Sequence, residues 1–575
     1  MGFQGWFAYK EESMKKVEGI ARRNPKGFGW LESLDGKSGG IFIPPHEMHQ
    51  LTDGDVVLAN VSKSPKGPIA EIIKVLKRST PQSAEATDLQ SEIDYLIRNA
   101  QAETQFSNKS LRAAKQFAEN PTPEDQKGRR DLKKLALCTI DGETAKDFDD
   151  AVYGYQDGKN YGVLVAIADV SHYVPERSPI DIDAFKRSTS IYYPGHCIPM
   201  IPEALSNGLC SLKPKVPRLC MTVELIIGPS GTVKWVEVGE GVMKSQARLT
   251  YTQVQKLIDS GFQSHAKIPK AVVESIRVLQ KAAIALRGAR MKRGSIDFDA
   301  VESVVALDAD GEPVAINPAE RQESNRLIED LMIAANEAVA KYLEDKGFPT
   351  IFRIHEPPNS EKLKAFAVMA QAIGALTPGH YKQLEKAHES PAVLAKLLES
   401  FKDHPAKATL ESALLRSMMQ ARYSSNNLGH YGLASKSYLH FTSPIRRYPD
   451  LIAHRILRQS FTKKVHVPNL QEIADHCSNQ ERKATDLERQ IHALHAAWFM
   501  QDKIGEKHDA VITGKTEFGL FVRLKQHHVE GLVHISTLRG NQLATAKIGD
   551  PVKIQVDGVN IARRHIDFSL VPQKR

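Results

Sequence analysis

Four aspartates lie within ten positions of this chain and could together hold divalent cations. They are Asp141, Asp147, Asp149 and Asp150, and the apolar run 135–140 leads into the first of them. We therefore expect Asp141 to cap a buried strand and the other three to lie on the loop that follows. Carboxylates packed this closely repel one another, so a bare buried cluster would take up protons. Divalent cations would remove the repulsion and keep every oxygen ionised.

The ligand type indicates which metal the cluster would hold. Hard carboxylate oxygens, with no pairing of cysteine and histidine nearby, favour Mg²⁺, with Mn²⁺ as a substitute, over zinc. An EF-hand is excluded because its glycine at loop position 6 and its glutamate at position 12 are missing, whether counting starts at Asp141 or at Asp147. A solvated acidic loop and a structural calcium site remain open from these residues alone.

A second segment, residues 440–455, places two arginines after a Ser-Pro turn. Arg446 and Arg447 follow this turn, and helical periodicity is expected to resume from Leu451. Guanidinium groups at such a position suit bidentate binding of phosphate. Carboxylate-held metals and an arginine on a phosphate are the parts of two-metal phosphodiester hydrolysis.

Five segments, in this order, resemble the catalytic (RNB) domain of the ribonuclease II and ribonuclease R family. They are residues 138–152, 191–202, 209–212, 354–358 and 440–455. The resemblance implies a hydrolytic exoribonuclease that acts in RNA turnover. Such an enzyme degrades single-stranded RNA from its 3′ end, processively and without sequence specificity, to 5′-mononucleotides by a two-metal mechanism.

The resemblance also implies roles for the acidic and arginine residues. The four aspartates match the positions of the metal site, and Asp149 is the one on which we expect catalysis to depend most. Arg446 matches an arginine that neutralises charge developing on the scissile phosphate. Arg447 is expected either to contact RNA or to pair with a structural carboxylate.

Further residues match positions that contact the last nucleotide. Tyr192 and Phe298 match residues that clamp the terminal base. Tyr251 and Glu488 match positions associated with the choice of ribose over deoxyribose, since only ribose carries a 2′-hydroxyl. Asp169 belongs to the family signature, and we expect it to have a structural, hydrogen-bonded role.

Both ends of the chain have the pattern of small RNA-binding barrels. Short alternating runs between residue 15 and about residue 78 are separated by turn residues and resemble a five-stranded, cold-shock-type OB fold. Its Phe28, Trp30 and Phe42 are candidates for stacking single-stranded bases, although any one of them could instead be core. The C-terminal segment resembles an S1-type OB fold, with Phe518, Phe521 and His534 as candidate base-stacking residues.

A chain of 575 residues is too long for one core, so we predict a multidomain α+β protein. The expected parts are a cold-shock-type OB barrel at 1–78, a helical linker at 79–130, a mixed α/β RNB catalytic domain at 131–460, a helical connection at 461–505 and an S1-type OB barrel at 506–575.

Composition agrees with an RNA partner. The formal charge is +9 and the pI is near 9.0 despite the acidic cluster. The excess positive charge therefore lies elsewhere and can attract a polyanion. A mildly basic protein without such a partner has a similar net charge. The five cysteines form no CxxC pair and are expected to be reduced core thiols. With no apolar stretch of transmembrane length and no signal-peptide core, we expect a soluble, cytoplasmic monomer whose partner is single-stranded RNA with a free 3′ end.

Two other classes of function remain as alternatives. A catalytically retired RNA-binding protein would have lost an aspartate, and none of the four is missing. A DNA nuclease or a cyclic-nucleotide phosphodiesterase would use the same cation chemistry, but the two RNA-type barrels argue against it.

Overall fold

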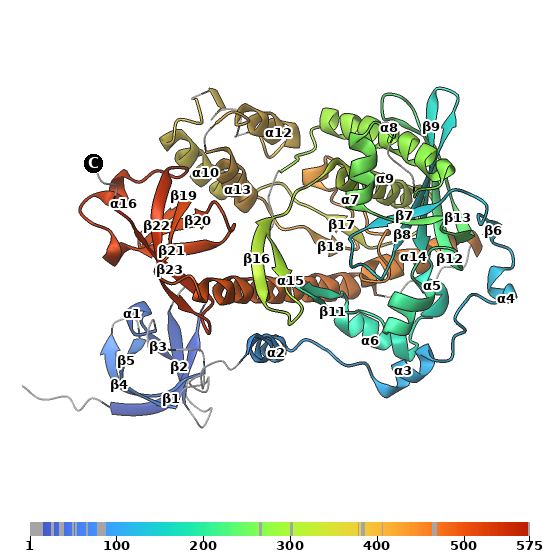
Figure 1. Ribbon diagram of the computed structural model, residues 1–575. Helices are drawn as coiled ribbons and strands as arrows, with labels where there is room; N and C mark the ends of the chain where they lie inside the picture. Colours follow the sequence, from blue (N-terminus) through green and yellow to red (C-terminus); the bar gives the residue numbers. More distant parts are fainter. Residues whose placement is uncertain are drawn as a thin grey trace, which may run out of the picture. The chain divides into compact units, whose positions relative to one another are not determined.

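The chain folds into two compact units, Met1–Glu92 and Ile93–Arg575 (Figure 1). The structure is a computed structural model. It describes residues 15–24, 28–33, 40–48, 51, 54–64, 67–77, 88–263, 267–298, 303–377, 379, 380, 384, 386–404, 406–462 and 469–572.

The first unit contains a closed five-stranded barrel in the order β1-β2-β3-β5-β4. Its elements are β1 Lys15–Arg23, β2 Gly29–Ser33, β3 Ile41–Ile43, α1 Pro45–Met48, β4 Val56–Ser64 and β5 Gly67–Lys77. Alternation along the strands turns one set of side chains inward, and Leu31, Ile43 and Val57 are at most 1% exposed. This arrangement confirms the OB-type barrel predicted from the spacing of the turns.

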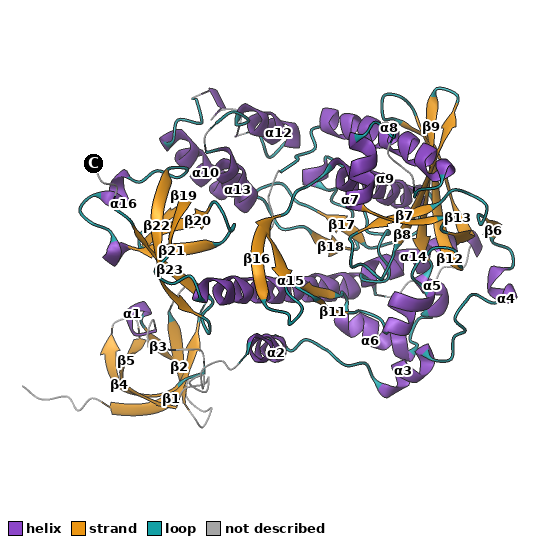
Figure 2. Cartoon of the chain, viewed as in Figure 1, coloured by secondary structure: helices purple, strands orange, loops and turns teal. Residues whose placement is uncertain are grey.

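A seven-stranded sheet forms the centre of the second unit, in the order β14-β7-β8-β9-β12-β13-β6. The strands are β6 Arg130–Asp131, β7 Cys138–Asp141, β8 Asp150–Asp157, β9 Asn160–Ala168, β12 Pro217–Ile227, β13 Val233–Lys244 and β14 Ala247–Thr250. The central strands β9 and β12 are buried along most of their length because both their faces are covered, and β9 is apolar from Val163 to Ala168. Helices α8 Lys270–Arg293 and α9 Glu323–Asp345 pack against this sheet (Figure 2).

Helices and short hairpins surround the sheet. The linker predicted to be helical contains α2 Leu89–Asn99, α3 Asn108–Ala114 and α4 Pro123–Gln126. Nearer the sheet are α5 Val170–Tyr173, α6 Pro179–Arg187, β10 Ile191–Tyr193, β11 His196–Ile198, η1 Ala204–Leu209, α7 Tyr251–Asp259, β17 Phe352–Ile354, β18 Arg422–Ser424, η2 Tyr431–Leu433 and α14 Tyr448–Thr462. A second apolar core is built by α10 Ser360–Ala372, α12 Pro391–Ser400 and α13 Lys407–Ser417.

A single 32-residue helix, α15 Leu470–Gln501, leads to a second closed barrel of order β19-β20-β21-β23-β22. The barrel consists of β19 Lys507–Thr516, β20 Gly519–Leu524, β21 Glu530–His534, η3 Ile535–Thr537, α16 Gln542–Thr545, β22 Pro551–Asn560 and β23 His565–Leu570. Its core includes Met500 from α15 and Ile316 from the hairpin β15 Ser303–Leu307 and β16 Pro313–Pro318. A closed five-stranded barrel is therefore present where the sequence predicts the C-terminal OB fold.

Three details differ from the sequence-based expectations. Asp150 is the first residue of β8, where it pairs with Ile167, and does not belong to the preceding loop. Helix α14 begins at Tyr448, three residues before the expected point. Four cysteines are buried, but Cys197 is exposed because it lies on the two-stranded β10–β11 hairpin outside the main sheet. None of the described helices is both long and apolar enough to cross a membrane.

Asp169 has the structural role expected for it. Its side chain is fully buried, caps α5 by accepting from His172 N, and lies 2.8 Å from Arg129 Nη2 and 2.5 Å from Arg458 Nη2. Burial alone would raise the pKa of this carboxyl, but the charges of Arg458 and Arg129 outweigh burial and hold the pKa at about 2. The ion pairs join the start of the domain to α14.

Replacing Asp169 with Asn should lower the free energy of unfolding by about 3 kcal/mol at pH 7, because the buried Arg129 and the partly buried Arg458 lose one counter-charge and keep only Glu240. The folded pKa lies below the unfolded value of about 3.9, so the loss should be full above about pH 4 and shrink as pH falls toward 2. Urea unfolding at several pH values measures this. The control is Asp509→Asn, which breaks an exposed pair with Lys553 and should cost at most about 1 kcal/mol; equal losses would contradict the assignment.

Candidate metal and nucleic-acid site

Two neighbouring strands bring the acidic segment together at one end of the sheet. Strand β7 ends at Asp141, strand β8 begins at Asp150, and the two strands run antiparallel. The connecting loop is held by Ser211, whose Oγ accepts from Phe148 N at 3.0 Å and donates to the carbonyl of Lys146 at 2.7 Å. The loop therefore returns on itself and places Asp141 and Asp150 at the same sheet edge.

The arginine segment closes over this loop from almost three hundred residues away. Asp149 Oδ1 accepts a hydrogen bond of 2.9 Å from Ile445 N, and its Oδ2 lies 3.7 Å from Arg446 Nε. Asp149 is only 6% exposed, whereas the Arg446 side chain is 44% exposed. Arg446 thus partly balances the buried carboxylate and still presents its guanidinium to solvent.

Burial and mutual repulsion raise the pKa values of Asp141, Asp149 and Asp150, so these carboxyls are difficult to ionise. Burial raises the pKa of Asp149 well above its usual value, with Arg446 acting in the opposite direction. Burial, together with the charge of Asp141, raises the pKa of Asp150 to about 7. The pKa of Asp141 is raised by burial and by Asp147. One arginine is therefore too little positive charge for this cluster.

The same residues fit a cation by their chemistry. Asp150 Oδ2 is buried and has no hydrogen-bond partner, so one acceptor points at no donor of the protein. In the described part of the chain, no three acidic, histidine or cysteine side chains are yet arranged to hold a metal ion. Because like charges keep carboxylates apart until a cation screens them, we expect these oxygens to draw together when a metal binds.

A small hairpin carries Tyr192 to the acidic loop. Its strands β10 and β11 pair Tyr192 with Cys197, and they turn at Pro194 and Gly195, where Gly195 has a φ of +76°. The Tyr192 hydroxyl donates to Asp147 Oδ2 at 2.9 Å, and the backbone N–H of Tyr192 donates to Glu488 Oε1 at 2.8 Å. The structure thus places three of the predicted site residues in direct contact.

Tyr251 and Phe298 lie in different surroundings. Tyr251 begins α7, and its pKa is raised by burial and then by the charges of Asp150 and Asp141, so its ring lies near these carboxylates. Phe298 packs against the second apolar core formed by α10, α12 and α13. Contact of Phe298 with a terminal base stays a prediction.

Arg447 differs from its neighbour Arg446 in orientation and partner. Its Nε donates to Asp450 Oδ2 at 2.9 Å and its Nη2 to Asp450 Oδ1 at 2.8 Å, while Asp450 also accepts from Ser443 N. The carboxylate is completely buried. Of the two expectations for Arg447, pairing with a structural carboxylate is present, and a contact with RNA stays a prediction.

The barrel aromatics form exposed groups of rings. Phe28, Trp30 and Phe42 lie with ring centroids 5.5 to 6.0 Å apart, and Trp30 is 42% exposed. In the C-terminal barrel, Phe518 is 49% exposed and meets Phe521 edge to face at 5.9 Å. His534 is exposed and pairs in register with Gly519, next to Phe518. Such rings are accessible for stacking.

Sequence reasoning missed two residues that support the site. Ser211 lies in the segment 209–212, whose pattern gives no sign that its hydroxyl fixes the acidic loop. Asp450 orients Arg447, and its position three residues later at the start of α14 is a spacing that allows such a pair.

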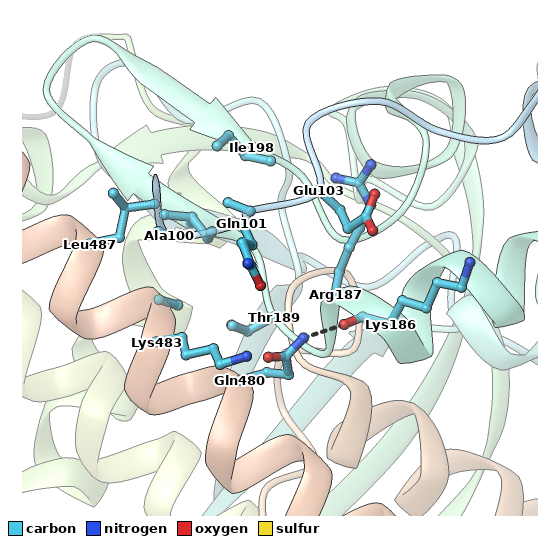
Figure 3. Close-up of a pocket in the computed structure, with 13 residues that line it drawn as sticks. Ala100, Gln101, Glu103, Lys186, Arg187, Thr189, Ile198, Gln480, Lys483 and Leu487 are labelled. Carbon is cyan, nitrogen blue, oxygen red and sulfur yellow. Dashed lines mark hydrogen bonds between the residues drawn. The ribbon is translucent and has the colours of Figure 1, made fainter. Parts of the chain in front are cut away.

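A cleft lies behind the Tyr192 hairpin, between the hairpin and α15 (Figure 3). Ile191 and Ile198 of the hairpin and Leu487 of α15 line it, and Gln480 Nε2 donates to the carbonyl of Lys186 at 2.6 Å. Thr189, on the same wall, donates to the carbonyl of Arg446 at 3.2 Å. The hairpin and the arginine segment are therefore held by one continuous set of contacts.

Comparison with known proteins gives matches over nearly the whole chain. The RNB domain family matches residues 129–463, the S1 RNA binding domain family matches 501–570, and the ribonuclease B OB domain family matches 19–75. Ribonuclease R of Escherichia coli (strain K12) is 37% identical, over 96% of this chain and 70% of its own length. Ribonuclease R 1 of Lactococcus lactis subsp. lactis is 33% identical, over 99% of this chain and 80% of its own length.

The fold also matches a solved structure along nearly its full length. Mycoplasma genitalium RNase R in complex with ribose methylated single-stranded RNA gives a TM-score of 0.82 at 25% sequence identity. The match covers 96% of this chain and 100% of that chain.

Replacing Asp150 with Asn should weaken Mn²⁺ binding at least about tenfold, because an amide is a poorer ligand for a hard cation and carries no charge. In EDTA the same variant should unfold at a higher temperature than the wild type, since it relieves the repulsion with Asp141. Calorimetric titration and thermal unfolding measure the two effects.

The control is Asp157→Asn at the exposed end of the same strand. Equal Mn²⁺ affinity of the wild type, Asp150→Asn and Asp157→Asn would contradict a metal role for Asp150.

Proposed function

Because the chain belongs to the ribonuclease R family of RNB-domain 3′-to-5′ exoribonucleases, we propose that it degrades single-stranded RNA processively to 5′-mononucleotides with Mg²⁺ at the aspartate cluster. The enzymes of this family are hydrolytic and depend on a metal. The finer points, which are two ions, Mg²⁺ as the natural metal and a role in RNA turnover, are our inference.

The convergence of three separate segments carries this proposal. Asp149 meets Ile445 and Arg446, and Asp147 meets the hydroxyl of Tyr192. An arginine, acidic side chains and a half-exposed ring therefore meet at one place. These are the groups needed to bind a phosphate, hold cations and support a base.

We expect the four aspartates to hold the metal, and Asp150 offers an unpartnered oxygen for it. Bound ions would activate the attacking water and stabilise the leaving 3′-oxygen. The protein would contribute charged side chains and hold them in position around the scissile phosphate. Arg446 can reach the scissile phosphate from its half-exposed position and stabilise the charge that develops there.

Tyr192 is proposed to hold the terminal nucleotide square to the acidic loop. The residue is 38% exposed, and its hydroxyl and its backbone N–H are held by Asp147 and Glu488. A flat ring supports any base, which suits degradation without sequence specificity. Glu488 and Tyr251 flank the aspartates, where a 2′-hydroxyl could be recognised.

The two barrels are proposed to bind the RNA strand before it reaches the catalytic residues. Each presents accessible rings, Trp30 in the first and Phe518 in the second. The net charge of +9 favours a polyanion although the acidic site itself is negative. Binding and chemistry should therefore be separable by mutation.

Replacing Asp149 with Asn provides the sharpest test of this function. The change keeps the shape and the hydrogen bond from Ile445 N but removes one negative charge and one hard ligand. The single-turnover rate of RNA cleavage should fall by orders of magnitude, whereas the dissociation constant for RNA should change less than about tenfold, or roughly 1.4 kcal/mol. Quench-flow kinetics and filter binding on one 5′-labelled RNA measure both.

A DNA strand of the same sequence, and a small cyclic phosphodiester, serve as substrate controls for the wild type. Near-normal cleavage of RNA by Asp149→Asn would rule out the acidic loop as the catalytic centre. Equal cleavage of RNA and DNA would favour a general phosphodiesterase.

Replacing Tyr192 with Ala should lengthen the smallest product that resists digestion, because short ends lose the ring that holds their last base. Affinity for long RNA should stay nearly unchanged, since the barrels bind it. A sequencing gel of end products, beside a filter-binding curve, gives both readouts. Tyr192→Phe is the matched variant that keeps the ring, and an unchanged product ladder in Tyr192→Ala would mean that another side chain supports the base.

A further inference from the structure

The hairpin β15–β16 is attached to the C-terminal barrel along one side. At its open end, Ser303 Oγ lies 2.7 Å from His528 Nδ1 and donates to the carbonyl of His528 at 3.3 Å. Ile316 is 2% exposed and belongs to the core of the barrel, and Val305, which pairs with it, packs against the same core. Because apolar burial and a polar contact act together here, the hairpin and the barrel should move as one body.

The other end of the β15–β16 hairpin contacts the turn between β10, which carries Tyr192, and β11. Leu307 is the last residue of β15, and a methyl group placed on Gly195 would come within 2.9 Å of its Cδ1. The Leu307 side chain therefore lies directly against the backbone of the Pro194-Gly195 turn. The φ of +76° at Gly195 favours glycine at this position of the turn.

Helix α15 forms a second, independent connection between the C-terminal barrel and the β10–β11 hairpin. Glu488 accepts from the backbone N–H of Tyr192, while Ala497 and Met500 lie in the core of the barrel. Nine helical residues from Glu488 to Ala497 span about 14 Å, and the four steps from Ser303 to Leu307 span about 13 Å. Figure 1 shows β16 beside α15, and the two elements are in contact. The Tyr192 hairpin is thus supported from the barrel by two connections of similar length.

We propose that Leu307 is a positioning residue for the terminal nucleotide, an inference that rests on the proposed role of Tyr192. Leu307 holds the turn of the β10–β11 hairpin, while Glu488 holds its first strand. With both contacts the ring of Tyr192 has one orientation relative to Asp147. Without Leu307 the turn can tilt about the Glu488 contact, and displacements of about 1 Å are enough to slow a reaction strongly.

The experiment compares three substitutions in the full-length protein. Leu307→Ala should lower the single-turnover rate on a saturating short oligoribonucleotide about tenfold and lengthen the smallest resistant product. The dissociation constant for long RNA should stay within about twofold, because the barrels are unchanged. Leu307→Met, which conserves volume, should keep the wild-type rate and ladder. Val304→Ala, on the same strand but 53% exposed, is the matched control and should also behave as wild type.

A double variant separates this inference from the function on which it rests. If Leu307 acts through Tyr192, adding Leu307→Ala to Tyr192→Ala should cause no further loss. Additive losses would overturn the inference, as would a loss in Val304→Ala equal to that in Leu307→Ala. A wild-type rate and ladder in Leu307→Ala, beside an altered ladder in Tyr192→Ala, would overturn it and leave the role of Tyr192 intact. An unaltered ladder in Tyr192→Ala would instead remove the proposed clamp.

Discussion

Repulsion between carboxylates at one edge of the sheet is the constraint on which the rest of the site depends. Two aspartates, one fully buried and one with a single buried oxygen, show the two ways in which this fold meets this constraint. Asp169 is neutralised by the protein itself, since Arg129 and Arg458 contact it and hold its pKa at about 2. Asp150 has an unpartnered oxygen and a pKa raised to about 7. The positive charge that Asp150 lacks is what a cation would supply, and this contrast supports our proposal that Asp150 binds metal whereas Asp169 stabilises the fold.

The adjacent residues Arg446 and Arg447 have different roles near the acidic loop. Arg447 donates to Asp450, which also accepts from Ser443 N. These hydrogen bonds hold the segment 443–450 in place without a ligand. Arg446, held through its backbone by Thr189, keeps an exposed guanidinium. A site that must stabilise charge in a transition state needs such groups already in place, because reorganising them during the reaction would cost part of the gain. Rigidity of the loop and availability of the charge therefore come from neighbouring residues with different partners.

Much of this arrangement could be predicted from the sequence, and the limits have physical causes. The barrels were predictable because alternation and turn residues are local signals, and the motif around Asp141 was recognisable for the same reason. The position of Asp150 inside a strand was not, since a loop residue and the first residue of a strand differ only in whether they pair with the neighbouring strand, here β9. Contacts such as Glu488 with Tyr192, or Leu307 with Gly195, join segments that no local pattern connects. Cys197 was expected in the core because its segment is apolar, but a two-stranded hairpin leaves one face open.

The long separation between contacting segments has a consequence for the newly made protein. Asp149 is hydrogen-bonded to Ile445, and Tyr192 to Glu488. Each of these contacts of the proposed centre can form only after residues translated about three hundred codons later have been made. Chains emerge from the ribosome at about 5–20 residues per second, which leaves the centre incomplete for roughly 15 seconds or more after its aspartates appear. During that interval the messenger RNA being read lies beside an unfinished nuclease. On the proposed placement of the centre, activity would therefore begin only after Ile445, Arg446 and Glu488 have been made.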